Sequence, residues 1–510
     1  MKNRSARAAA IDFTVSYPLW NYVPDGFRQN GLPALKGNVC VNVLFSGFDE
    51  YSREVFRCVS SCVQFLACGD ERNDADVKSK ADARNEEDVR NEAGVKNEAD
   101  GRNEARGLAP FAIDYFAFCD EETADVAEEE FCRGFYRYRE FLSGVGGKEN
   151  EYLPIAPTPF SFSFVRGKRR SGVVEKLRRI SEIGKSSLNI VVIGNGNVED
   201  DGADERAVRE AAEKLSDRSC DSDRSGDSGD FSAAADGFTE ASGDFTKADF
   251  RTVVFRLSDG RWKCAFDSFA ADAAEGCAEN VNSWGYRSVN GISGSGESGG
   301  ALEPLDEEFG RVRRFAAYRN ALYVKEKQSR EGKFVPFEEI LGKTLDEKID
   351  MFGRDMQSVC AFSGLVFYCS ALGFDVVKDE NPKKRRKNET AAIGKSAFAA
   401  LRDIFVTCEH YRWNACMIVN GYVPANKDEI LNGIATVDGA KVYTNGTDKQ
   451  AGKHGNLTTF SGLELFADMI SERDGVPVRK VEVKTFDAQL IDNADELFAF
   501  SGLKIVRRAR

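Results

Sequence analysis

The chain has 510 residues, of which 42% are hydrophobic and 30% are charged, and its formal net charge is −13 at pH 7. This length suits roughly two to four domains with hydrophobic cores. The negative charge disfavours a general nucleic-acid binder, because most of the surface would repel a phosphate backbone, and we expect no nucleic-acid partner. No apolar run approaches the roughly 18 residues that cross a bilayer, and the N-terminus has no signal-peptide core. We therefore expect a cytoplasmic protein without a membrane partner.

The 13 cysteines follow no paired spacing. Most simply, they are reduced thiols of a cytoplasmic protein core. A cysteine nucleophile acting with His410 or His454 stays an alternative, but no acidic residue is placed to orient such a pair.

An apolar run over 38–45 predicts a buried parallel strand, which leads through a turn at Gly47 into a helix over 51–66. A strand, a glycine turn and a helix in this order begin a dinucleotide-binding fold. In that fold, glycines let the backbone approach a pyrophosphate at the N-terminus of the helix. The sequence thus makes Gly47 a candidate cofactor-binding residue.

The glycine pattern around this turn is incomplete. Ser46 and Ser52 stand at the flanking glycine positions, and Asp49 and Glu50 add negative charge that would repel phosphate. Two alternatives stay open: a functional dinucleotide site, and a scaffold that kept the fold and lost the ligand.

Three further apolar runs fit the same fold, at 111–118, 188–193 and 252–256. The first ends near Asp120, an acidic residue of the kind that often holds a ribose hydroxyl. The second precedes Gly194-Asn195-Gly196, so Gly194 and Gly196 form either a phosphate loop or an ordinary turn. Strands that alternate with helices predict an α/β fold with a doubly wound parallel sheet.

With this element order and the partial glycine turn, the N-terminal half resembles the Rossmann-like domains of bacterial potassium-transport regulators. The resemblance implies a nucleotide cofactor such as NAD or an ADP-ribose derivative, although the sequence does not identify one. An enzyme that binds NAD or processes a nucleotide in this half is the alternative function. We find no acid–base pair to support it, and so a protein that is not an enzyme is favoured.

Several segments interrupt the predicted fold. Residues 69–107 are highly charged and repeat a basic-Asn-Glu triplet every six residues, and 199–248 are rich in Asp, Ser, Gly and Ala. Both predict flexible insertions, as does the Gly-Ser-rich stretch at 290–300. The basic run at 383–387 is either a nuclear-localisation signal or, as we favour, a solvated loop.

Residues 309–374 predict a mostly helical connector. Within it, 361–373 are apolar nearly all round, which is typical of a buried helix. Such a helix would lie between two domains or in a dimer interface, so a homo-oligomer is left open.

The chain has only two histidines, His410 and His454, and both stand in the C-terminal region. Apolar residues at spacings of three and four predict a helix over about 396–420. Glu409, Trp413 and Cys416 are expected to share one of its faces. Arg412 can reach Glu409 at a separation of three residues.

The simplest interpretation is that Trp413 anchors the core and that the Glu409–Arg412 pair stabilises the helix. A metal site built from Cys408, His410 and other ligands is an alternative. Cys408 and His410 lie about 200° apart around a helix, so both could not bind one ion, and we expect no metal.

Three features follow one another in the C-terminal region: the stretch Glu409-His410-Tyr411-Arg412-Trp413-Asn414-Ala415, the Gly421-Tyr422 turn, and the Lys453-x-x-x-Leu457 segment with His454. Together they resemble the RyR domain. This small helical module is repeated in ryanodine receptors and also occurs in bacterial proteins. The resemblance covers about 396–506, and its closing helix would run from Phe486 to Ile505. Tyr422 stands where the family usually has Trp, and Gly455 where Pro is common.

The resemblance implies a ligand-binding module. Its candidate residues are Glu409, His410, Arg412, Trp413, Asn414, Tyr422, Lys453 and His454. Basic side chains would neutralise a phosphate and aromatic rings would stack on the ligand. We expect a cytoplasmic sensor or regulator of a phosphorylated, nucleotide-derived small molecule, with a structural protein whose pockets are empty as a further alternative.

The predicted organisation has four parts. They are an N-terminal extension (1–37), a divergent Rossmann-like domain (38–265), a linker and helical connector (266–395) and a small, mainly helical RyR-like domain (396–510).

Overall fold

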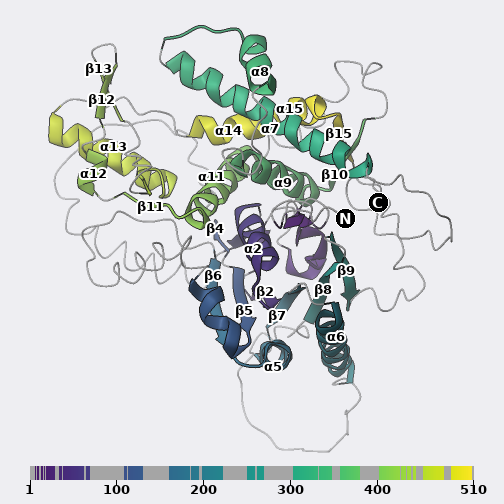
Figure 1. Cartoon of the computed structure of the whole chain (residues 1–510). Helices are drawn as coiled ribbons and strands as arrows, with labels where there is room; N and C mark the ends of the chain where they lie inside the picture. Colours follow the sequence, from purple (N-terminus) through teal and green to yellow (C-terminus); the bar gives the residue numbers. More distant parts are fainter. Residues whose placement is uncertain are drawn as a thin grey trace, which may run out of the picture.

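We describe a computed structural model of the chain (Figure 1). The structure describes residues 19–28, 34–62, 65–68, 108–129, 160–194, 198–221, 250–268, 303–346, 356–379, 401–443, 452–475 and 484–507. Some of these ranges contain gaps of one or two residues, and a few single positions between 6 and 17 are also described. The predicted insertions at 69–107 and 290–300, and the basic run at 383–387, lie outside them.

A six-stranded sheet forms the centre of the N-terminal half, in the order β6-β5-β2-β7-β8-β9. The first five of these strands are parallel, and β9 pairs antiparallel with β8. The strands are β2 (Val39–Ser46), β5 (Ile113–Cys119), β6 (Phe160–Arg166), β7 (Ser186–Ile193), β8 (Phe250–Ser258) and β9 (Arg261–Asp267).

The strand order is consistent with a Rossmann-like α/β fold. Counted along the chain, the parallel strands lie in the order third, second, first, fourth, fifth, which is the doubly wound arrangement. The predicted strands at 38–45, 111–118, 188–193 and 252–256 are confirmed, whereas β6 and β9 were not predicted. The topological switch point lies between β2 and β7, where the strand order reverses.

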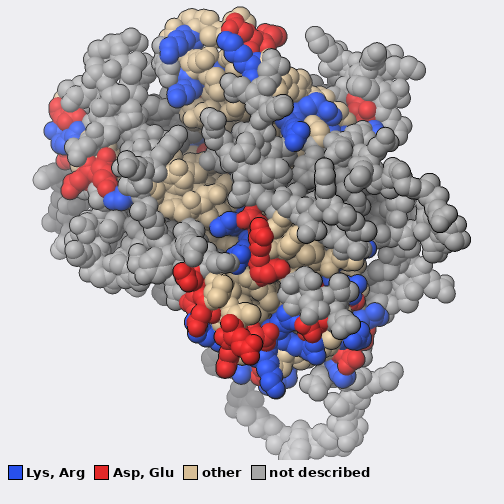
Figure 2. Space-filling view, viewed as in Figure 1, with Lys and Arg blue, Asp and Glu red and all other residues tan. Residues whose placement is uncertain are grey.

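Helices cover both faces of this sheet. Its two faces belong to different hydrophobic clusters: Val43 and Phe45 of β2 contribute to one, and Leu44 to the other. Helix α2 (Glu50–Cys62) lies on the first face, while α5 (Arg169–Glu182) and α6 (Val198–Asp221) cover the second. Over α5 and α6, acidic and basic side chains are interspersed (Figure 2).

Helix α6 corrects one sequence expectation. The stretch 199–248 was expected to be a flexible insertion, but residues 199–221 belong to this helix. The reason is the apolar stripe of Val208, Ala212 and Leu215, which is buried against the sheet. The rest of the stretch, 222–248, lies outside the described residues.

The C-terminal half packs directly on α2. Helices α9 (Met356–Ala371) and α11 (Arg402–Val419) contact α2 and each other, and α7 (Glu303–Arg330) packs on α9 (Figure 1). Side chains from all of them join the cluster that covers the first face of the sheet. The apolar helix expected in the connector is therefore α9, buried between the sheet domain and the C-terminal helices.

The described part of the N-terminal extension belongs to the same core. It contains η1 (Leu19–Tyr22), η2 (Asp25–Phe27) and β1 (Ala34–Leu35), which pairs with β3 (Leu66–Cys68); β4 (Leu108–Pro110) completes this small sheet. The buried ring of Trp20 lies 5.2 Å from that of Phe367 on α9, centroid to centroid.

After α11 the chain forms short elements around three helices. These are β11 (Val423–Pro424), α12 (Lys427–Leu431), β12 (Ile434–Val437), β13 (Ala440–Tyr443), β14 (Lys453–His454), α13 (Phe460–Asp474), α14 (Lys484–Asp492), α15 (Ala494–Phe500) and β15 (Leu503–Arg507). In the connector, α8 (Phe337–Asp346) packs on α7, and β10 (Phe374–Lys378) pairs antiparallel with β15.

The closing helix expected from Phe486 to Ile505 is wrong in its extent. The segment forms two helices and then a strand, because Gly502, with a φ of 74°, redirects the chain after α15. Ile505 lies in β15, opposite Val376 of β10.

Among the described residues, the structure contains no helix that is both long and apolar enough to cross a membrane.

Candidate functional site

The two histidines of the chain converge on the ring of Trp413. Helix α11 carries His410 and Trp413, and it ends at Val419, two residues before Gly421, whose φ of 87° lets the chain turn back. The following strand β11 pairs parallel with β14 and so places His454 beside the helix. The Trp413 ring lies 6.0 Å from that of His410 and 4.9 Å from that of His454, centroid to centroid. The Tyr422 ring lies 6.2 Å from His454.

Helix α11 presents two different faces. His410, Trp413 and Asn414 point toward α13 and β14, whereas Glu409 and Arg412 point toward α2. Trp413 lies beside His410, as the helical spacing predicts, and Cys416 lies on the side of Arg412 and Cys360.

Both ring nitrogens of the buried His410 face acceptors. Nε2 lies 2.8 Å from the carbonyl oxygen of Thr458, and Nδ1 lies 3.1 Å from Oδ2 of Asp487 on α14. The two contacts, one to a side chain of α14 and one to the backbone before α13, fix the orientation of the imidazole ring. The same Thr458 carbonyl accepts a second bond, from Nδ2 of Asn414, at 3.0 Å.

His454 is neutral in the same surroundings. Burial, and then the charge of His410, lower the pKa of His454 to about 4. Its Nδ1 accepts a hydrogen bond from the backbone N–H of Asn456 at 3.1 Å, which leaves the ring proton of the neutral form on Nε2.

Two amide oxygens at this cluster lack a hydrogen-bond donor. Oδ1 of Asn414 and Oδ1 of Asn456 are both buried and both unsatisfied. Buried acceptors normally have a partner in the protein or in ordered water. The cluster formed by His410, Trp413, Asn414, His454 and Asn456, which we call the histidine–tryptophan cluster, thus offers two places for a donor beside aromatic rings.

The cations expected to neutralise a phosphate are paired within the protein. Nε and Nη2 of Arg412 each donate to the carboxylate of Glu409 at 2.7 Å, and Nη1 donates to the carbonyl oxygen of Ser61 on α2 at 2.9 Å. Arg412 and Glu409 are both fully buried. Lys453 pairs with Glu429 of α12.

This pairing corrects the expected role of Arg412. Its guanidinium has no exposed donor to offer a ligand, because it joins α11 to α2 in the core. Glu409 is likewise engaged, and Arg319 of α7 approaches it at 3.8 Å. The sequence indicated the Glu409–Arg412 pair, and the structure confirms it.

The candidate cofactor residues lie at the carboxyl edge of the sheet. Gly47 follows β2 and has a φ of 84°, and its N–H donates to the carbonyl oxygen of Phe118 at 2.9 Å. Asp120 follows β5, and its Oδ1 accepts from the N–H of Arg169 at 3.2 Å. Gly196 lies outside the described residues.

Gly194 follows β7, on the other side of the switch point. A Cβ atom at this position would stand 2.8 Å from the Trp262 ring and 3.1 Å from Cβ of Leu257, so glycine is required by close packing. Gly47 and Gly194 are thus engaged within the fold, and the close packing at Gly194 does not fit the approach of a pyrophosphate. The Asp120 side chain is 51% exposed.

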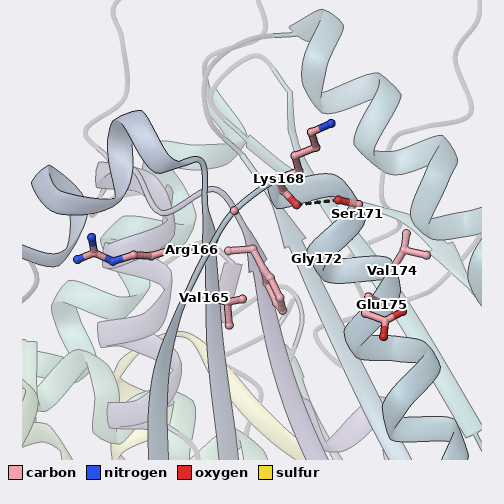
Figure 3. Close-up of a pocket in the computed structure, with 9 residues that line it drawn as sticks. Val165, Arg166, Lys168, Ser171, Gly172, Val174 and Glu175 are labelled. Carbon is pink, nitrogen blue, oxygen red and sulfur yellow. Dashed lines mark hydrogen bonds between the residues drawn. The ribbon is translucent and has the colours of Figure 1, made fainter.

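An open hollow of about 520 Å³ lies beside the start of α5 (Figure 3). Arg166 points away from it and pairs with Asp125 and Glu128. The Ser171 hydroxyl donates to the carbonyl oxygen of Lys168 at 3.1 Å, and the Lys168 side chain points outward. The polar groups drawn around the hollow do not converge on it, unlike those of a typical ligand pocket.

Within the described parts of the chain, no three or more His, Cys, Asp or Glu side chains are arranged to hold a metal ion. The nine cysteines whose side chains the structure describes are free thiols. A hydrogen bond with the Cys360 thiol, and then burial, raise the pKa of Cys416 well above its ordinary value, which disfavours the nucleophilic thiolate.

Four partners of the site were not expected from the sequence: Ser61, Glu429, Thr458 and Asp487. Asp487 stands 77 residues from His410, and Ser61 stands 351 residues from Arg412. No local spacing signals contacts of this kind.

Fold and site together define an α/β protein with a mostly parallel six-stranded sheet, to which a helical C-terminal region is joined through α2. A scan of protein-family models, a search of curated proteins and a search of solved structures each gave no match to the chain.

Proposed function

We propose that this protein is a cytoplasmic, ligand-responsive regulator in which the RyR-like region, 396–510, binds a nucleotide-derived small molecule at the histidine–tryptophan cluster. One observation carries the proposal: the two histidines of the chain meet at one tryptophan, beside two buried amide oxygens without donors. Free thiols throughout the described residues suit the reducing cytoplasm.

The cluster suits a heteroaromatic group better than a phosphate. Trp413 and Tyr422 offer ring faces, and the oxygens of Asn414 and Asn456 accept hydrogen bonds from amino groups such as those of a nucleobase. Arg412 and Lys453 are already paired with carboxylates. We therefore propose recognition of the base, in place of the phosphate recognition expected from the sequence.

Helix α11 supplies a route from the ligand to the rest of the protein. One face carries the cluster, and the other carries the buried Glu409–Arg412 pair that contacts α2. A ligand alters output only through different affinities for two states. In this proposal the two states differ in how the elements around α11 pack on that helix.

The test is a thermal-shift screen of the full chain against nucleosides, nucleotides, NAD, ADP-ribose and cyclic nucleotides. A ligand in excess should raise the melting temperature through mass action. The shift should disappear in Trp413→Ala and weaken in Asn414→Ala. It should persist in the control Asp403→Ala, which lies on the same helix with a side chain that is 83% exposed.

A shift that survives Trp413→Ala would contradict the site. No shift with any of these compounds would favour the second candidate, a structural or interaction protein, which the full burial of Arg412 supports. The NAD-dependent or nucleotide-processing enzyme has less support, because Gly47 and Gly194 are engaged in the fold.

A further inference from the structure

The N-terminus of α2 already holds a carboxylate of this chain. Asp49 directly precedes the helix, and its Oδ1 accepts from the N–H of Ser52 at 2.9 Å. In dinucleotide-binding folds, the first helix after the first strand points its free N–H groups at the pyrophosphate. Asp49 occupies this position as an N-cap, and its burial raises the pKa of its carboxyl group.

The crevice at the switch point is bridged by a hydrogen bond. The hydroxyl of Ser52, in the first turn of α2, donates to the carbonyl oxygen of Gly194 at 3.2 Å. Gly194 directly follows β7, so the bond joins the two sides between which a dinucleotide would lie. Trp262, 3% exposed, covers Gly194.

A second acid fills the edge between α5 and α6. The carboxylate of Asp204, on α6, is 1% exposed and accepts from the Ser46 hydroxyl at 2.7 Å. It also accepts from Nε of Arg170 at 2.7 Å and lies 3.1 Å from Nε of Arg169. The two arginines at the start of α5 are thus neutralised from within the fold.

We propose that the carboxyl edge of the sheet is self-liganded: the Asp49 carboxylate takes the place of a cofactor phosphate, and Ser52 closes the crevice across the switch point. The edge then acts as a fixed support and does not bind nucleotides. This inference concerns the N-terminal sheet domain, whereas the histidine–tryptophan cluster lies in the C-terminal region. Either proposal can therefore fail without the other.

The test removes the internal anion and supplies an external one. Glycine at an N-cap position destabilises a helix only slightly relative to Asp, so Asp49→Gly should fold and leave the N-terminus of α2 open. Inorganic phosphate at millimolar concentration should then raise the melting temperature of Asp49→Gly clearly more than that of the parent, relative to chloride at matched ionic strength. Glu50→Ala is the control, because it removes the same charge from the same helix end while Asp49 stays in place.

Calorimetric titration of the parent with NAD and ADP-ribose gives the second measurement. Trp413→Ala serves as the background, so that binding at the cluster is not counted, and no binding is expected. Phosphate stabilisation that is equal in the parent, Glu50→Ala and Asp49→Gly would overturn the proposal. Micromolar binding of NAD to the Trp413→Ala protein would also overturn it, and this second result stands even if Asp49→Gly does not fold.

Discussion

Replacing Arg412 with methionine tests whether the contact between α11 and α2 depends on a buried charge pair. Methionine keeps much of the length of arginine but has no donor. The substitution removes two bonds to Glu409 and one to the carbonyl oxygen of Ser61. The Glu409 carboxylate, which has no exposed surface, is left with Arg319 at 3.8 Å as its remaining cation.

The expected loss follows from this burial. Removing one partner of a buried ion pair destabilises a protein by about 3–5 kcal/mol, because the other charge stays buried without compensation. Arg319 compensates part of the Glu409 charge, so we expect a loss near the lower end, about 3 kcal/mol. The double variant Glu409→Leu/Arg412→Met removes both charges, and it should recover most of the lost stability.

The assay is urea-induced unfolding of the parent, of the single variants Arg412→Met and Glu409→Leu, and of the double variant. Arg402→Met is the matched control, because Arg402 lies on the same helix and makes an equally short bidentate pair with Asp492, at 2.6 and 2.7 Å. That pair is 42% and 46% exposed, and it should contribute no more than about 1 kcal/mol. Equal losses in Arg412→Met and Arg402→Met, or a double variant as unstable as Arg412→Met, would refute the reasoning.

Three further predictions concern acid stability, glycine packing and thiol accessibility. Because the folded protein lowers the pKa of His454 from 6.5 to about 4, the unfolded chain takes up this proton first as the pH falls. The chain should therefore lose about 3 kcal/mol of stability between about pH 6.5 and about pH 4. In urea unfolding, His454→Gln should remove that loss. A His454 proton resonance that titrates near 6.5 would contradict this prediction. Gly194→Ala should destabilise the protein by about 1–3 kcal/mol, because the added Cβ would clash with Trp262. The control is Gly342→Ala, which has open space around the added Cβ and should be neutral or stabilising. Both are measured by thermal unfolding. Iodoacetamide labelling followed by mass spectrometry should leave the buried thiols unmodified until urea is added, and rapid modification in the native protein would show that the helix or strand that carries the thiol opens. These thiols are Cys58, Cys62, Cys119, Cys360, Cys369, Cys408 and Cys416.

The parts of the fold that depend on local pattern could be predicted from the sequence. The apolar runs of β2 and β7 are long because both strands are central in the sheet and covered on both faces, and the asparagine within each run, Asn42 and Asn189, is buried and bonded to the other. The edge strand β6 alternates Phe with Ser and lies beside only one neighbour, so its pattern was weaker. In α6, the acidic composition concealed a three-residue apolar stripe.

The candidate site was predictable only in part. The proximity of His410 to Trp413 follows from helical spacing, and the Glu409–Arg412 pair follows from their separation of three residues. The burial of Arg412 could not be predicted, because it depends on α2, more than 300 positions away in the chain. A charged helix face normally lies in solvent, but the face of α11 that carries Glu409 and Arg412 lies against α2 inside the core.

These contacts also indicate which elements around the cluster can respond to a ligand. Rotating α11 would break the bonds of Arg412 to Glu409 and Ser61 and expose or separate fully buried charges, which is costly. Helix α14, which carries Asp487, is also held on α11 by the Arg402–Asp492 pair and by the buried Leu490 and Ile491. The segment that carries His454 and Thr458 is joined to α11 through bonds to the Thr458 carbonyl and through ring contacts of the two histidines. A ligand that donates to the Asn414 oxygen would act beside these bonds. We therefore expect α11 to stay fixed on α2 and α14, and the segment that carries His454 and Thr458 to be the element that a ligand displaces.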